Sequence, residues 1–421
     1  MIRKSSLYLF PAALPGLLAA LPAAAQSHCP PQWLPAGDLA TANSRVNALT
    51  VWDPDGDGPA QPLLIAGGWF TSIDGQPANR IAAWDGAAWH ALGTFNFSVN
   101  VLGTHDGYLI AGSRFSGVTQ WNGASWQQLS PTMTGSDPGV FALADYNGEL
   151  VVGGEFTGLV GVAGTRGIAR WNGATWSPLG SGTDGSVYAL TVYSGELVAA
   201  GSFTTAGGSV ASRIARWDGS QWRPLSGGLG GLGNTLGLSL AVLNDQLYVG
   251  GAFTFAGGHS APYIARWNGE SWSSVGLGLD STVDALAVSN GNLFVGGGFT
   301  YAAGFPLLHG VGRWNGVSWQ SLGPGVDRNV FALVTYRGDL VTGGDFITAG
   351  GISSPYLARW GSPPPACPAD YNCSSTRDVN DIFVFLADWF SHLPGADWNG
   401  NGLFEIADLF GFLGAWFAGC P

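Results

Sequence analysis

A unit of about 47 residues recurs seven times between residues 33 and 362, and this repetition restricts the possible folds more than any other feature. Its first mark is the start of an apolar segment, at Val46, Val99, Val140, Val187, Gly237, Val283 and Val330. The second is a phenylalanine, in a Gly-x-Phe sequence everywhere but in the second unit, at Phe70, Phe115, Phe156, Phe203, Phe253, Phe299 and Phe346. The third is Trp-Asn/Asp-Gly-x-x-Trp, starting at Trp84, Trp121, Trp171, Trp217, Trp267 and Trp314. Repeats of this length indicate a solenoid or a propeller.

The tryptophan motif distinguishes between these two architectures. Trp360 opens a seventh copy, which residues 361–363 end before its second tryptophan. The missing piece lies at the other end of the chain, where Trp-Leu-Pro-Ala-Gly at 33–37 matches Trp-His-Ala-Leu-Gly at 89–93. We therefore expect a strand at 32–38 to complete the last unit. A ring closed in this way leaves no open sheet edge, whereas a stacked solenoid needs no such complement.

Each unit predicts four strands. Strand one is typified by residues 187–192, strand two by 247–251 and strand three by 264–267, and an Asn-Gly or Asp-Gly hairpin leads to strand four. The integrin-type tripeptide Arg337-Gly338-Asp339 occupies the turn after strand one, so we interpret it as a turn. The fold class that follows is an all-β, seven-bladed propeller over residues 26–362.

The second unit is shorter than the others. Six positions separate Phe115 from Trp121, against 14 or 15 between the corresponding residues of the other units. This shortening predicts a notch in the rim of the propeller, which is either a ligand entrance or the result of sequence drift.

An Asn or Asp residue lies three positions before each apolar segment. The seven residues are Asn43, Asn96, Asp137, Asp184, Asn234, Asp280 and Asp327. In a propeller, the link from strand four to the next strand one passes the mouth of the central channel, so a ring of these side chains could hold a cation or a polar ligand. Alternatively, each side chain caps its own turn, because Asn and Asp accept hydrogen bonds from nearby backbone N–H groups.

The N-terminus predicts export. Arg3 and Lys4 precede an apolar run and then Ala23-Ala24-Ala25, which is the pattern of a signal peptide spanning residues 1–25. The run is too short for a membrane span. The leader contains two of the 16 basic residues and none of the 28 acidic ones, so the mature chain carries a net charge of −14. Such a charge repels nucleic acid and anionic lipid. We expect a secreted or cell-surface protein.

Catalytic patterns are scarce. The six histidines fall at unrelated positions of the repeat and form no spaced metal motif, and no nucleophile elbow is present. A pair of carboxylates on the propeller loops, such as Asp184 with Asp280, could still hydrolyse a glycoside.

The last 55 residues contain one segment twice, at an offset of 27. Each copy is an oxygen-rich loop followed by an apolar-faced helix, which is typical of calcium-binding loops. The first loop offers Asp370, Asn372, Ser374, the Thr376 carbonyl and Asp381. The second loop offers Asp397, Asn399, Asn401, the Leu403 carbonyl and Asp408. Ser375 replaces the glycine that the sharp turn favours, while the second loop keeps Gly402, so we expect tighter calcium binding there.

The four cysteines leave three possible pairings. Cys367 and Cys420 bracket the duplicated segment, which favours a bridge between them and leaves Cys29 with Cys373. The pairing of Cys29 with Cys367 and of Cys373 with Cys420 is the alternative.

Two resemblances add to these expectations. The consensus GGxFTxAGG…IARWNGxxWxxLGxG…VxALxV resembles kelch-like and galactose-oxidase-like propellers, and it implies architecture rather than activity. Residues 367–421, which follow a Pro-rich linker at 363–366, are similar to dockerin-like modules of secreted planctomycete-type proteins. This second resemblance implies a small, all-α, EF-hand-like domain that binds Ca²⁺ and docks to a cohesin-like or other surface protein. Phe390 and Phe417 are candidates for the docking surface.

Two functions remain open from the sequence. The first is a non-catalytic binding or surface-assembly protein, with the propeller binding a carbohydrate or a protein and the tail providing calcium-dependent attachment. The second is a polysaccharide-active enzyme anchored through the same tail.

Overall fold

The structure is a computed structural model that describes residues 31–34, 41–56, 58–304, 307–362, 370–371, 377–392, 396–398 and 403–418. The leader, the linker at 363–366 and all four cysteines lie outside the described residues, so the signal peptide, the domain boundaries and the disulfide pairing remain predictions. The chain divides into two compact units, one formed by Gln32–Gly361 and the other containing the C-terminal helices.

The larger unit is a β-propeller. Its described residues form seven four-stranded antiparallel sheets, here called blades one to seven in the order of their innermost strands. These innermost strands are β2 (Val46–Trp52), β8 (Val99–His105), β13 (Gly139–Tyr146), β18 (Val187–Tyr193), β25 (Leu236–Leu243), β31 (Val283–Ser289) and β35 (Val330–Tyr336). The second strands are β3 (Leu63–Gly68), β9 (Tyr108–Ser113), β14 (Glu149–Glu155), β19 (Glu196–Gly201), β26 (Gln246–Ala252), β32 (Asn292–Gly297) and β36 (Asp339–Gly344).

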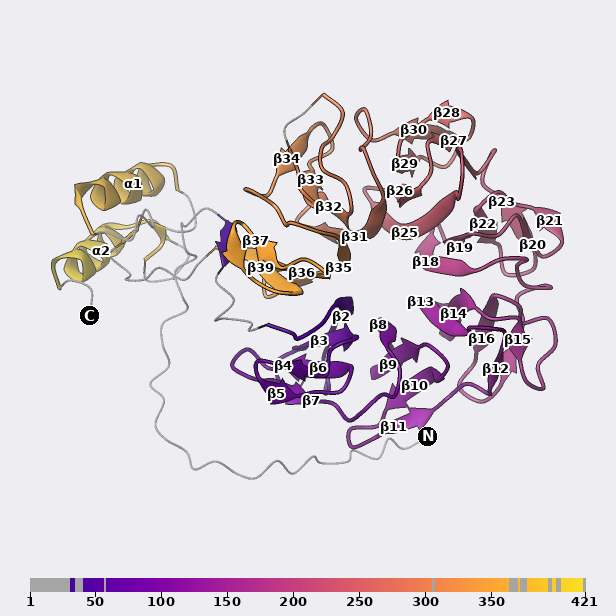
Figure 1. Ribbon diagram of the computed structural model, residues 1–421. Helices are drawn as coiled ribbons and strands as arrows, with labels where there is room; N and C mark the ends of the chain where they lie inside the picture. Colours follow the sequence, from indigo (N-terminus) through magenta and orange to yellow (C-terminus); the bar gives the residue numbers. More distant parts are fainter. Residues whose placement is uncertain are drawn as a thin grey trace. The chain divides into compact units, whose positions relative to one another are not determined.

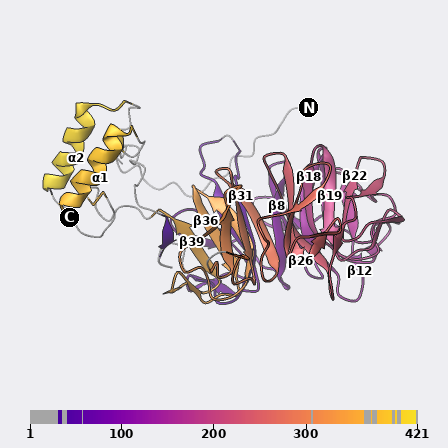
Figure 2. The same cartoon turned by 90° about the horizontal axis from the view of Figure 1, so that it is seen from above.

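The outer half of each blade contains the tryptophan motif. The third strands are β6 (Ile81–Trp84), β10 (Gly117–Trp121), β16 (Ile168–Trp171), β22 (Ile214–Trp217), β29 (Ile264–Trp267), β33 (Val311–Trp314) and β39 (Leu357–Gly361). The outermost strands are β7 (Trp89–Ala91), β11 (Trp126–Gln128), β17 (Trp176–Ser177), β23 (Trp222–Pro224), β30 (Trp272–Ser274), β34 (Trp319–Ser321) and β1 (Gln32–Leu34). Figure 1 shows these sheets arranged in a ring, with the first strand of each sheet innermost. Figure 2 gives the view turned by 90°, in which the ring of sheets is seen from its edge.

Short strands occupy the connections between strands two and three and before strand one. They are β4 (Ser72–Ile73), β5 (Gln76–Pro77), β12 (Met133–Thr134), β15 (Gly158–Leu159), β20 (Thr205–Ala206), β21 (Ser209–Val210), β24 (Leu229–Gly230), β27 (Phe255–Ala256), β28 (His259–Ser260), β37 (Thr348–Ala349) and β38 (Ile352–Ser353). In blade two the chain passes from β9 to β10 through three residues and has no such strand between them.

The two ends of the propeller sequence share one sheet. β1 pairs with β39, with Trp33 opposite Trp360, so the last sheet has the order β1-β39-β36-β35. The described part of this strand is shorter than the predicted 32–38, because residues 35–40 lie outside the described residues.

A tryptophan hydrogen bond joins each of six blades to the blade before it. The indole N–H of the outermost strand donates to a backbone carbonyl of the preceding blade, over distances of 2.6–3.4 Å. The pairs are Trp126 with Leu92, Trp176 with Leu129, Trp222 with Leu179, Trp272 with Leu225, Trp319 with Val275, and Trp33 with Leu322. The last of these joins residues 289 positions apart, so Trp33 makes in blade seven the contact that a local tryptophan makes elsewhere.

Glycine and valine fit together where adjacent blades pack. A Cβ atom on Gly153 would lie 2.5 Å from Cγ1 of Val187 in the next blade, and six of the seven blade junctions have this Gly–Val pair. The junction between blades four and five differs on both sides, because it has Ala200 in place of the glycine and Gly237 in place of the valine. A Cβ on Gly237 would lie 2.8 Å from that of Ala200, so the total volume of the pair is limited. At this junction the larger residue of the pair belongs to the preceding blade, whereas at the other six it belongs to the following blade.

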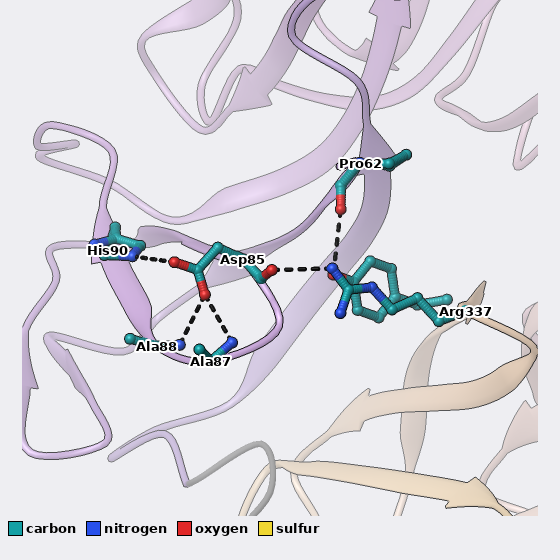
Figure 3. A network of polar contacts seen from close by, with 7 residues as sticks. Pro62, Asp85, Ala87, Ala88, His90 and Arg337 are labelled. Carbon is teal, nitrogen blue, oxygen red and sulfur yellow. Dashed lines mark hydrogen bonds and ion pairs between the residues drawn. The ribbon is translucent and has the colours of Figure 1, made fainter. Parts of the chain in front are cut away.

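A second set of contacts joins blade seven to blade one (Figure 3). The Arg337 guanidinium donates to the Asp85 carbonyl at 3.0 Å and lies 5.0 Å from the Tyr336 ring centre, while the Tyr336 hydroxyl donates to the Pro62 carbonyl at 3.2 Å. The Asp85 carboxylate accepts from the N–H groups of Ala87 and Ala88 and contacts His90, which fixes the turn that Arg337 reaches. Arg337 has a left-handed backbone (φ 51°), so the tripeptide 337–339 forms a turn whose arginine is engaged within the protein.

The smaller unit contains two helices, α1 (Val379–Phe390) and α2 (Ile406–Ala418). Asp378 caps α1, because its carboxylate accepts from the Asn380 N–H while Asp381 accepts from the Asp378 N–H. Phe385 and Phe412, which are equivalent in the 27-residue duplication, are fully buried and stack with ring centres 4.2 Å apart. In the described part of the chain, neither helix is long and apolar enough to cross a membrane.

We predict that Gly237→Val destabilises the protein by about 1–3 kcal/mol, because the added methyl groups meet Ala200 in a packed junction. Combining it with Ala200→Gly recreates the pair found at the other junctions, so most of this loss should be recovered. Urea unfolding of the two single variants and the double variant measures the coupling. Additive effects of the two substitutions would show that these positions do not determine the packing of the junction.

Candidate functional site

All seven innermost strands contain a β-bulge near their first residue. The pairing with strand two shifts by one residue at this point in every blade, so one residue of each inner strand has no partner opposite it. A bulge turns its extra side chain away from the regular alternation of the sheet. The seven bulge residues are Asn47, Asn100, Phe141, Tyr188, Leu238, Asp284 and Phe331.

Six of these bulge residues line a cavity of about 240 Å³ formed by the seven inner strands. We call this cavity the central channel and the ring of bulge residues the bulge ring. Below the bulge ring, one leucine from each blade lines the channel, namely Leu49, Leu102, Leu143, Leu190, Leu240, Leu286 and Leu333. The leucines repeat in every blade, whereas the bulge position carries amide, aromatic, aliphatic and acidic side chains.

The bulge ring has an aromatic side and a polar side. Phe141 and Tyr188 lie in adjacent blades with ring centres 5.6 Å apart at an angle of 60°. In blades one and two the ring has amides, and the Asn100 carbonyl oxygen accepts from the Ser98 hydroxyl at 2.8 Å. The Asn100 amide nitrogen is buried and has no hydrogen-bond partner among the described residues. A buried donor without a partner is costly, so a ligand or water that accepts from it would be favoured there.

Asp284 is the acidic member of the bulge ring. Burial, followed by the negative charge of Asp345 in the next blade, raises the pKa of this carboxyl to about 6, and a hydrogen bond with the Thr282 side chain opposes the shift in part. Near neutral pH the group is therefore close enough to its pKa to exchange a proton or to donate a hydrogen bond when a ligand excludes water.

The seven Asn and Asp residues that precede strand one do not line the central channel. Four of them cap the connection between strands two and three of their own blade: Asn43 accepts from the N–H groups of Thr71 and Ser72, Asp184 from Thr204 and Thr205, Asp280 from Thr300 and Tyr301, and Asp327 from Ile347 and Thr348. The capped segment lies 20 or more residues further along the chain, rather than in the local turn that the sequence suggested.

The remaining three residues of this set behave differently. Asp137 forms an ion pair with Arg114 of the preceding blade. Asn96 and Asn234 make no side-chain hydrogen bond with other described residues.

Asp184 is poorly suited to act as a general acid. Burial raises its pKa, but hydrogen bonds from the Thr204 side chain and from the Thr205 and Thr204 N–H groups outweigh this effect and lower the pKa below its usual value. A carboxyl that stays ionised and bonded to the backbone cannot readily deliver a proton. Asp137 and Asp184 do both line a second cavity of about 220 Å³, together with Glu155 and Arg166.

The smaller unit has a buried acidic residue in each copy of its duplicated segment. Asp381 and Asp408 are fully buried, and their carboxylates accept from the N–H groups of Asp378 and Glu405 at 2.8 and 2.9 Å. Asp370 is also buried, and Asp397 is partly buried. Buried carboxylates are favourable only when charge or hydrogen bonds compensate them.

The calcium ligands named from the sequence are only partly described. Asn372, Ser374, Thr376, Asn399 and Asn401 lie outside the described residues, and Leu403 is exposed. Within the described part of the chain, no three His, Cys, Asp or Glu side chains are grouped as a metal cluster requires. The predicted loops take most of their oxygens from amides, hydroxyls and backbone carbonyls, which are not part of such a grouping.

The two helices present matching apolar residues to solvent. Val379, Phe383 and Phe390 of α1 are each more than half exposed, as are their equivalents in α2. These equivalents, at the 27-residue offset, are Ile406, Phe410 and Phe417. We call these six residues the helix patch. It contains Phe390 and Phe417, the two residues that the sequence suggested for a docking surface.

Comparisons with known proteins support the propeller. A family model described as a β-propeller domain of unknown function (DUF5122) matches residues 194–217. No curated protein matches the chain. The WD40 β-propeller domain of Doa1 is 14% identical with a TM-score of 0.51, over 78% of this chain and 96% of that chain. The extracellular domain of a putative one-component system from B. thetaiotaomicron is 10% identical with a TM-score of 0.52, over 78% of this chain and 39% of that chain. At these identities, the likeness concerns the fold alone.

We predict that Asp284→Asn makes the protein more stable at about pH 8 but leaves its stability near pH 4 almost unchanged. The Asp284 carboxyl has a pKa of about 6 in the folded chain, against 3.8 for an ordinary aspartate. Relative to a permanently ionised carboxylate, the protonated carboxyl therefore stabilises the fold fully below pH 3.8, and this stabilisation is lost as the pH rises through 6. This difference in pKa corresponds to on the order of 3 kcal/mol in the free energy of unfolding at pH 8.

Urea unfolding of both proteins across this pH range measures the effect. Asp345→Asn is the matched control, because it removes the neighbouring charge and should lower the pKa of Asp284 without changing the burial of that residue. Parallel pH profiles for the wild type and Asp284→Asn would contradict the assignment.

Proposed function

We propose that this chain is an exported binding protein in which a seven-bladed, kelch-like propeller binds a carbohydrate or protein ligand and a dockerin-like tail attaches it to a cohesin-like partner. The bulge ring is the observation that carries the first half. Positions that build the propeller hold nearly the same residue in every blade, while the bulge position differs from blade to blade and lies at the channel. Because the bulge position does not have to hold the same residue in every blade, its aromatic, amide and acidic side chains are suited to ligand recognition.

Two features of the tail support its proposed role in attachment, namely its buried carboxylates and its exposed apolar residues. Carboxylate oxygens are hard ligands that suit Ca²⁺, and a bound cation would compensate the buried Asp381 and Asp408. The helix patch supports docking, because matching apolar residues on two equivalent helices are costly to leave in water. The similar extracellular domain from B. thetaiotaomicron is consistent with a role outside the cell.

Binding without cleavage is the expected activity of the propeller. The purified mature chain is incubated with cellulose, chitin, xylan and β-1,3-glucan and scored both for co-sedimentation and for new reducing ends. We expect co-sedimentation with at least one polysaccharide, weakened about tenfold by Tyr188→Ala, and no reducing ends. Reducing ends that disappear in Asp184→Asn or Asp280→Asn would instead make the protein a glycoside hydrolase.

Calcium is expected to fold the tail, and the second loop is expected to bind it more tightly. Asp397→Ala should therefore lower the calcium-induced rise in the melting temperature more than Asp370→Ala does, because loop two keeps the turn glycine. Calorimetry of the full chain with calcium and with a chelator measures this. Equal effects, or the reverse order, would contradict the assignment of the loops.

Docking is tested with a recombinant cohesin domain as the probe. Binding should require calcium and should be lost in the double variant Phe390→Ala/Phe417→Ala, whereas the same double change at Val379 and Ile406 should weaken it less. Calcium-independent binding, or binding unchanged in both variants, would count against the proposed attachment.

A further inference from the structure

Phe115 is the exception among the seven phenylalanines of the repeat. The other six are buried, with at most 5% of their surface exposed, while Phe115 is 47% exposed. The cause is the short connection of blade two, which passes from β9 to β10 through residues 114–116 and leaves no long segment to cover the ring. The position that forms part of the core elsewhere is therefore at the surface in this blade.

The backbone of Phe115 is also unusual. Its φ of 60° is left-handed, a region that bulky residues rarely adopt and that glycine occupies easily. Its N–H group donates to the Pro138 carbonyl at the start of the next blade, which holds this conformation. A strained and exposed aromatic residue persists only at a cost, and such residues gather at functional sites.

A second exposed aromatic residue lies against the first. Phe97, which precedes β8, is 42% exposed, and its ring centre lies 4.9 Å from that of Phe115 at an interplanar angle of 53°. Phe97 is three residues before Asn100 of the bulge ring, so the pair lies at the same end of blade two as the mouth of the channel. The two rings form an open aromatic platform.

Polar groups border this platform. Asn96 is exposed and makes no side-chain hydrogen bond with other described residues, because the segment that its counterparts cap is missing in blade two. Arg114 and Asp137 pair with each other, with Nε of Arg114 2.6 Å from the Asp137 carboxylate. The border therefore offers a free amide and an ion pair without net charge.

We infer that the Phe97–Phe115 platform is a stacking site for an uncharged sugar chain. The C–H face of a pyranose ring packs on aromatic faces, and a neighbouring amide donates to and accepts from its hydroxyls. An anionic ligand is disfavoured by the paired arginine and by the net charge of −12 of the full chain. A protein partner needs on the order of 1,000 Å² of surface, which two half-exposed rings do not supply. The inference rests on the proposed ligand-binding role of the propeller.

Isothermal titration of the full mature chain with cellohexaose, chitohexaose and laminarihexaose tests the platform. We expect at least one of these glycans to bind, and Phe97→Ala and Phe115→Gly each to weaken that binding by about tenfold. Phe115→Gly should do so without lowering the melting temperature, because glycine relieves the left-handed strain. Phe255→Ala, which removes an equally exposed phenylalanine of blade five, is the matched control and should bind as the wild type does.

Three outcomes would overturn the inference. If Phe115→Gly lowers the melting temperature as much as Phe70→Ala does, the ring has a structural role. If binding survives the platform variants but is lost in Tyr188→Ala, the sugar occupies the bulge ring, and the proposed function stands without this site. If the wild-type chain binds none of the three glycans, the ligand class is wrong, while the tests of calcium binding and docking still decide the role of the tail.

Discussion

The propeller depends on a hydrogen bond between neighbouring blades, from a tryptophan N–H to a backbone carbonyl. The bond recurs at six junctions and places the indole in the seam where two sheets meet. In blade seven the tryptophan comes from the other end of the chain, because Trp33 of β1 donates to the Leu322 carbonyl of blade six. The Arg337 and Tyr336 contacts add a second connection, between blades seven and one. The closing sheet is thus held by side chains as well as by strand pairing.

A ring fixed in this way permits variation at its centre. The Gly–Val pairs leave little freedom where blades pack, as the exchange of Ala200 and Gly237 illustrates, since a change on one side is matched on the other. The bulge residues escape this constraint because no residue of strand two lies opposite them. The same reasoning applies to blade two, where removal of the long connection exposes Phe115 and leaves Asn96 without a segment to cap. Both candidate sites therefore occur where the repeat no longer dictates the residue.

The sequence predicts the propeller and the order of its strands well, because turn residues and apolar alternation recur and errors in one unit are corrected by the others. The match of residues 33–37 to residues 89–93 likewise points to the strand pairing that the structure contains. The candidate site could not be predicted from the sequence to the same extent. Asn and Asp at one repeat position suggested either a ring at the channel mouth or caps of the local turns, whereas four of these side chains cap segments 20 or more residues further along the chain. The bulge that directs residues 47, 100 and 284 into the channel depends on strand register, and the raised pKa of Asp284 depends on Asp345 in another blade; neither is visible in a linear pattern.

The smaller unit uses its internal duplication in the same way that the propeller uses its repeat. Phe385 and Phe412 stack on each other, and the bonds from Trp389 to the Glu405 carbonyl and from Trp416 to the Asp378 carbonyl are exchanged between the two copies. Each copy therefore completes the other, so neither loop-helix segment has its core alone. Because equivalent residues also make up the helix patch, the surface carries two similar halves. The differences between the copies, such as Asp388 at the position equivalent to Ala415, distinguish these two halves.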